Sequence, residues 1–127
     1  MRFLLACVAM LWAGIAAADP IAGVWQTAPE ADGGFAHVTI APCGAAFCGT
    51  ITRTYVDGKN TPTEYVGARV VMDMVPQAGG DYRGRLLRPT NNRQYTGKAS
   101  VQGDRLRVSG CVAGGLICDG ETWVRVR

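Results

Sequence analysis

The feature that most constrains this chain is a pair of alternating patterns joined by a short turn with a cysteine at each end. Between His37 and Tyr55, polar and apolar side chains alternate on both sides of the turn that links Cys43 to Cys48. A period of two is what a strand with one buried face requires. Two such runs separated by a few residues that include glycine are typical of a hairpin. The stretch therefore predicts an antiparallel hairpin whose turn carries two cysteines.

The same alternation continues to the end of the chain. Turns rich in Gly, Pro, Asn and Asp separate the runs, and after residue 18 no stretch shows helical periodicity over three turns. We expect about eight short strands, within residues 19–27, 35–56, 67–75, 81–87, 93–101, 105–111 and 122–127.

These strands predict an all-β protein. An antiparallel up-and-down β-barrel of about eight strands is favoured, because closing the sheet removes its exposed edges. Small residues at expected inward positions, Gly84, Gly97 and Ala99, fit a tightly bent barrel. An open sandwich made of the same strands is the alternative.

The first 18 residues are typical of a secretory signal peptide. Arg2 precedes an apolar run that ends in Ala16-Ala17-Ala18, which is the three-part pattern of a cleaved leader. A membrane anchor is the alternative, but the run is shorter than the roughly 20 apolar residues that a spanning helix needs. We expect residues 1–18 to be removed, leaving residues 19–127 as a single domain without a transmembrane anchor, periplasmic or secreted.

The charge balance argues against one class of partner. The chain has 13 Lys and Arg against 10 Asp and Glu, a formal charge of +3, and its arginines are scattered along the expected strands. Proteins that bind nucleic acid usually gather such charges on one face. We therefore expect no nucleic-acid partner.

Four cysteines remain after the leader: Cys43, Cys48, Cys111 and Cys118. An even number in a small exported domain is typical of disulfides, and three pairings are formally possible. The local pairing of Cys43 with Cys48 and of Cys111 with Cys118 is favoured, since each pair faces across a short turn. A four-cysteine zinc site is the competing interpretation, disfavoured because the compartment is oxidising and Cys-x-x-Cys knuckles are absent from the sequence.

No catalytic motif is evident. His37 is the only histidine, and the sequence has no Gly-x-Ser-x-Gly elbow. Cysteines held in disulfides supply no thiolate nucleophile. We therefore expect a protein that is not an enzyme and that needs no metal or cofactor.

Two functions remain open. The first is binding of a small hydrophobic or amphipathic ligand inside the barrel, with residues 57–65 at the open end. The predicted contacts are apolar or aromatic side chains inside and two cations at the rim that would hold an anionic head group: Met72, Met74, Tyr82, Tyr95, Lys59 and Arg69. The alternative is an envelope maintenance or protein-interaction module with a packed barrel and no ligand.

Several short motifs resemble one family. They are Gly23-x-Trp25, the Cys-Gly-x-x-x-Cys-Gly of residues 43–49, Asp57-x-Lys59-Asn60, Arg69, Arg88-Pro89, Tyr95-x-Gly97, Gly110-Cys111 with Cys118, and Thr122-Trp123-x-Arg125. Together they resemble the small exported bacterial proteins known as domain of unknown function 2147, over nearly all of residues 19–127. Departures from the family pattern fall in loops and at a strand end, at residues 61–62, 87–88 and 91–93.

The resemblance implies a lipocalin-like (calycin) β-barrel, an envelope or secreted location, and no established activity. The Gly-x-Trp opening and the Trp-x-Arg ending resemble the lipocalin arrangement. In that arrangement Trp25 packs at the closed end of the barrel with Arg125 over its face, and Trp123 has a structural role. A guanidinium over an indole contributes about 0.5 to 2 kcal/mol.

Overall fold

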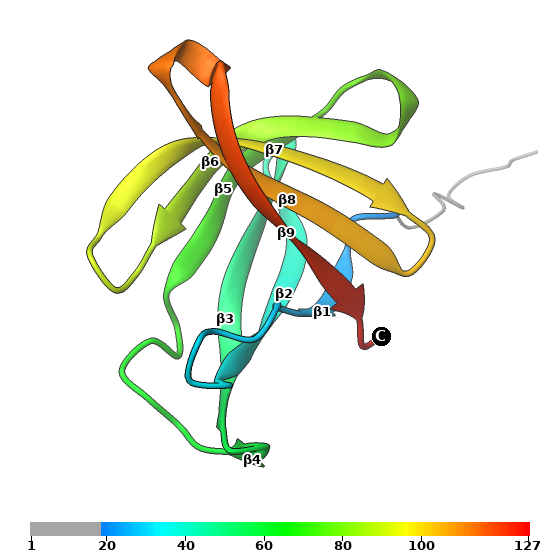
Figure 1. The fold of residues 1–127 in the computed structure, drawn as a ribbon. Helices are drawn as coiled ribbons and strands as arrows, with labels where there is room; N and C mark the ends of the chain where they lie inside the picture. Colours follow the sequence, from blue (N-terminus) through cyan, green and yellow to red (C-terminus); the bar gives the residue numbers. More distant parts are fainter. Residues whose placement is uncertain (1–18) are drawn as a thin grey trace, which may run out of the picture.

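The computed structural model describes residues 19–127, and the predicted signal peptide lies outside the described residues (Figure 1). The described chain forms nine strands and two single 3-10 turns. The strands are β1 (Gly23–Gln26), β2 (Phe35–Cys43), β3 (Ala46–Val56), β4 (Lys59–Asn60), β5 (Arg69–Pro76), β6 (Asp81–Arg88), β7 (Arg93–Gln102), β8 (Arg105–Val112) and β9 (Ile117–Arg125). The 3-10 turns are η1 (Ala78–Gly80) and η2 (Ala113–Gly115).

The sheet closes on itself. Its strand order is β2-β1-β9-β8-β7-β6-β5-β3-β4, and β2 also pairs with β3. Every pairing is antiparallel, and the two-residue β4 lies outside the closed ring, against the end of β3. The result is the predicted eight-stranded antiparallel up-and-down barrel, so the sandwich alternative is wrong.

Trp25 anchors the closed end. Its side chain is completely buried, and its Nε1 donates a hydrogen bond to the carbonyl oxygen of Ile21 at 2.9 Å. The guanidinium carbon of Arg125 lies 4.3 Å from the centre of the indole ring. The guanidinium also donates to the carbonyl oxygens of Ala22 at 3.0 Å and Pro20 at 2.6 Å. The predicted packing of Arg125 on Trp25 is confirmed.

The largest fully buried side chains gather in this half of the barrel. The bulkiest fully buried side chains around Trp25 are Ile21, Ile40, Met74 and Leu106. Gly97 makes room for them, since a Cβ on this residue would lie 2.8 Å from the Met74 Cε.

Strand β5 departs from the expected alternation. Val70 and Val71 are both buried, and the pairing with β6 shifts in register between Met72 and Val75. Asp73, inside this irregularity, has a φ of 51°. The bulge explains why the strict two-residue period expected for residues 67–75 is wrong, because an extra residue in one strand moves the following side chains to the other face.

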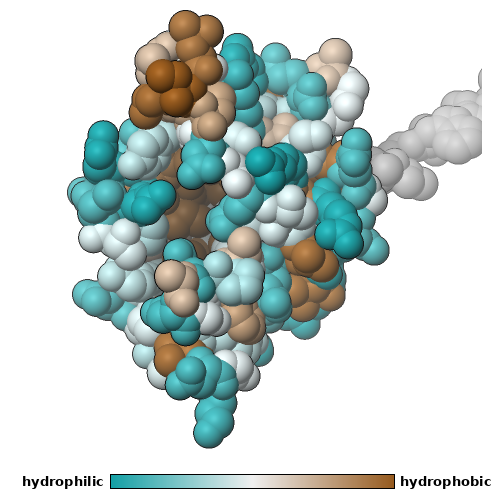
Figure 2. All heavy atoms as spheres, in the orientation of Figure 1, coloured by the Kyte–Doolittle hydropathy of each residue, from teal (hydrophilic) through white to brown (hydrophobic). Residues whose placement is uncertain are grey.

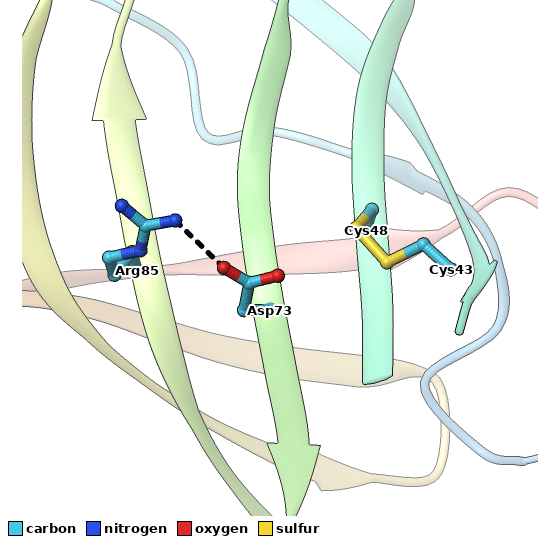
Figure 3. Close-up of a disulfide and its surroundings, with 4 residues drawn as sticks. All are labelled: Cys43, Cys48, Asp73 and Arg85. Carbon is cyan, nitrogen blue, oxygen red and sulfur yellow. Dashed lines mark hydrogen bonds and ion pairs between the residues drawn. A yellow bond between two sulfur atoms is a disulfide. The ribbon is translucent and has the colours of Figure 1, made fainter. Parts of the chain in front are cut away.

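Both local disulfides are present, as predicted. Cys43 and Cys48 close the turn between β2 and β3, with their Cα atoms 5.7 Å apart (Figure 3). Cys111 and Cys118 join directly paired positions of β8 and β9.

Within residues 19–127, no cluster of three or more His, Cys, Asp or Glu side chains could hold a metal ion. The same residues include no helix long and apolar enough to cross a membrane.

Candidate ligand-binding cavity

The barrel is hollow at the end opposite Trp25. A cavity of about 950 Å³ opens there, beneath the loops that follow β1, β6 and β8. Figure 2 shows a hollow with a hydrophobic interior between polar side chains. None of the large side chains that fill the closed half, namely Trp25, Ile21, Ile40, Met74 and Leu106, lines it. The barrel is therefore packed at one end and open at the other.

Apolar and aromatic side chains form the inner wall. Val38 of β2, Ile51 of β3, Val70 of β5, Leu86 of β6, Tyr95 of β7, Val108 of β8 and Trp123 of β9 all line the cavity, together with Tyr65 of the loop after β4. Each strand contributes the face that its two-residue period turns inward.

Gly110 lines the cavity and has no side chain to occupy it. A Cβ on this residue would lie 3.4 Å from the Tyr95 Cβ and 3.9 Å from the Leu86 Cδ1, which is ordinary contact distance. One methyl group would fit there, but a longer side chain would enter the cavity.

Strand β9 brings acidic groups into the wall. Every second residue of this strand lies on the same face. The residues on the face that lines the cavity are Ile117, Asp119, Glu121 and Trp123. The Trp123 Nε1 donates a hydrogen bond to the Glu121 Oε1 at 3.0 Å. This bond orients the carboxylate along the wall beside the indole.

The rim carries an exposed apolar tip. Leu116 is 86% exposed, Ile117 65% and Val112 44%, and all three belong to the hairpin between β8 and β9. Val112 and Ile117 also line the cavity, so apolar surface runs from the interior to the tip. The Cys111–Cys118 disulfide joins the two strands just below this tip.

Tyr95 is the one predicted ligand contact that lines the cavity. Met74 and Tyr82 are buried, but in the filled part of the core, and Met72 is only half-buried. The β5 bulge accounts for part of this change, since Val70 and Met72 were expected on one face of a regular strand and the pairing with β6 shifts in register after Met72.

The two predicted rim cations lie elsewhere. Lys59 and Arg69 are exposed and do not line the cavity. Lys59 belongs to β4, whose loop is tied back by a hydrogen bond from the Thr54 Oγ1 to the Thr61 carbonyl oxygen at 2.6 Å. Of residues 57–65, only Thr63 and Tyr65 line the cavity.

The acidic residues of the wall were not predicted. A pattern could have found two of them: Asp119 and Glu121 stand four and two positions before Trp123, and so share its face in a strand.

His37 lies outside the cavity wall. Its Nε2 lies 3.2 Å from the Gln26 Oε1, and its ring centre is 4.7 Å from that of Tyr55. Partial burial, and then the positive charges of Arg53 and Arg127, lower the pKa of His37. The side chain therefore belongs to a small aromatic cluster on the barrel, as expected of a residue on a strand face.

Comparison with known proteins agrees with this architecture. A solved structure of protein HP1028 from Helicobacter pylori, described as belonging to the lipocalin family, superposes with a TM-score of 0.65. The two sequences are 16% identical, and the match covers 84% of this chain and 82% of that one, a likeness that shows the fold. No curated protein matches the chain.

A family model supplies the assignment. The model described as "Uncharacterized protein conserved in bacteria (DUF2147)" matches residues 23–125, from the first residue of β1 to the last of β9. The chain therefore belongs to this bacterial family, domain of unknown function 2147, and has the lipocalin-like barrel that the sequence resemblance implied.

Proposed function

We propose that this protein is a non-enzymatic carrier or sensor that binds a small hydrophobic or amphipathic molecule in the barrel cavity. The observation that carries the proposal is the cavity of about 950 Å³ with apolar and aromatic walls. Small-molecule sites of proteins are commonly concave, largely apolar and about 300 to 1,000 Å³ in volume. An eight-stranded barrel is wide enough either to fill with side chains or to hold one small ligand.

The division of the barrel supports this function. Burial of apolar surface contributes about 25 cal/mol per Å², and the closed half obtains it from the packed side chains around Trp25. In the open half, the cavity wall includes Tyr65, Leu86 and Tyr95, which are only half-buried. A bound apolar molecule would cover that wall and stabilise the folded protein.

The proposed location is the periplasm or the extracellular space. Two disulfides in a small domain are typical of an oxidising compartment. The leader-like residues 1–18 support the same location.

One observation favours a second candidate function, an envelope interaction module. Leu116, Ile117 and Val112 expose apolar surface at the tip of the β8–β9 hairpin. Exposed apolar patches often mark protein or membrane contacts. In this alternative the tip binds a partner and the cavity has no ligand.

Titration of the mature protein with the uncharged fluorescent probe N-phenyl-1-naphthylamine tests the cavity. We expect saturable fluorescence enhancement. Gly110→Leu places a long side chain in the cavity and should weaken binding at least about tenfold, a loss of roughly 1.4 kcal/mol. Gly110→Ala, the matched control, adds one methyl at contact distance and should bind as the unmodified protein does.

Thermal melting of all three proteins shows whether each variant is folded. Absence of saturable probe binding by the unmodified protein would contradict the carrier function. So would equal binding by a folded Gly110→Leu variant, because the probe would then occupy another surface.

A further inference from the structure

The cavity has a charge opposite to that of the chain. The whole sequence carries a formal charge of +3, yet the cavity wall holds four carboxylates and one guanidinium, that of Arg88. The carboxylates belong to the loop after β1 and to β9: Glu30, Asp32, Asp119 and Glu121. A recess whose wall has an excess of one sign of charge concentrates ligands of the opposite sign.

These carboxylates are not neutralised by neighbouring side chains. Within residues 19–127, the ion pairs are Arg85 with Asp73 and Arg125 with Asp104, and neither involves a cavity carboxylate. The Glu121 Oε1 accepts the Trp123 indole hydrogen at 3.0 Å, which is a neutral donor. The negative charge therefore remains available to a bound molecule.

Aromatic rings accompany the carboxylates in the wall. Trp123, Tyr65 and Tyr95 all line the cavity, and ring faces attract cations, indole most strongly. The Tyr95 ring already has the guanidinium carbon of Arg93 at 5.6 Å from its centre. The Trp123 Nε1 donates to the Glu121 carboxylate, so an indole and a carboxylate lie together in the wall.

We infer that the cavity selects molecules that join an apolar body to a cationic group, such as an alkylammonium, over equally long anionic molecules. The inference rests on the proposed function and supplies the chemistry of the ligand. The apolar body contacts Val38, Val108 and Leu86, and the cation lies by Glu121 and Trp123. This reverses the sequence-based expectation of an anionic head group held by Lys59 and Arg69.

Competition against bound N-phenyl-1-naphthylamine tests the sign of the preferred charge. Decyltrimethylammonium, decanoate and decanol have the same alkyl length and differ in their head group. We expect the cation to displace half of the probe at a concentration about tenfold lower than decanoate does. Added salt should narrow this difference, because mobile ions screen exposed charges.

The double variant Asp119→Asn with Glu121→Gln should reduce the preference for the cation, measured as the ratio of the decanoate and decyltrimethylammonium concentrations that displace half of the probe. Asp57→Asn with Glu64→Gln is the matched control, since it removes two carboxylates that do not line the cavity. The control should keep the full preference. Loss of the preference in both variants would assign it to overall charge and overturn the inference.

The outcomes separate the two proposals. If the probe binds but decanoate competes as well as the ammonium compound, the inference is wrong and the carrier function stands. If the probe does not bind the cavity at all, the carrier function fails and the inference fails with it.

Discussion

At the scale of single residues, Tyr82 ties the start of the described chain to the barrel. Its hydroxyl donates a hydrogen bond to the Asp19 carboxylate, and its ring is buried in the filled half. Burial, and then the bond to Asp19, raise the pKa of Tyr82. The folded protein thus favours the protonated phenol more strongly than the unfolded chain does.

This difference predicts a loss of stability at alkaline pH. In the unfolded chain Tyr82 ionises near pH 10, so its contribution is fully present below that pH and declines as the pH rises toward the higher folded-state value. Urea unfolding between about pH 8 and pH 11 should show a steeper decline for the unmodified protein than for Tyr82→Phe. Tyr55→Phe, on the stacked Phe35–Tyr55 pair, is the control. Equal slopes for the unmodified protein and Tyr82→Phe would contradict the assignment.

At the scale of elements, the two disulfides hold hairpins at opposite ends of the barrel. Cys43–Cys48 closes the turn after β2, while Cys111–Cys118 lies below the tip at the cavity rim. Each joins residues close in sequence, separated by 5 and 7 positions. Their stabilising effects should therefore be similar, but their effects on the cavity should differ.

Replacing either pair by alanine should lower the free energy of unfolding by about 2 to 3 kcal/mol, as expected for short loops. Only loss of Cys111–Cys118 should also weaken binding of N-phenyl-1-naphthylamine, because Cys118 lines the cavity, whereas the Cys43–Cys48 turn does not. Urea unfolding and probe titration of the two double variants measure both effects. Unchanged probe binding after loss of Cys111–Cys118 would show that the rim hairpin needs no crosslink to form the cavity. Equal weakening in both variants would assign the effect to general destabilisation of the barrel.

The elements also show what the sequence could predict. Alternation and turn residues are local properties, so the strands, the closed barrel and both disulfides followed from them. The β5 bulge depends on the opposite strand: a Cβ on Gly84 would lie 2.5 Å from the Asp73 carbonyl oxygen. Such a contact between strands cannot be inferred from the pattern of one strand. Met72 and Met74, the ligand contacts predicted on β5, accordingly do not line the cavity.

At the scale of the whole molecule, the barrel closes along a narrow seam. Strands β1 and β9 pair through two positions, Trp25 with Arg125 and Gln26 with Val124, whereas β6 and β7 pair through eight. Close backbone approach strengthens the seam, since the Val24 amide donates to the Arg127 carbonyl oxygen at 2.6 Å. Gly23 permits it: a Cβ there would lie 2.6 Å from that same oxygen, and its φ is 136°.

The seam between β1 and β9 should therefore be the first part of the barrel to open. Arg125 stabilises it through its contacts with Trp25, Ala22 and Pro20. Hydrogen exchange should be faster at the amides of Val24 and Val126 than in β6, β7 and β8, because fewer bonds break in a local opening.

Arg125→Ala removes the cation over Trp25 and two charged hydrogen bonds. We expect a loss of about 2 kcal/mol at the seam, or roughly thirtyfold faster exchange there. Arg105→Ala, on neighbouring β8, is the control and should leave seam exchange unchanged. Uniformly faster exchange across all strands in Arg125→Ala would show that the barrel opens only by global unfolding and that the seam is no weaker than the rest.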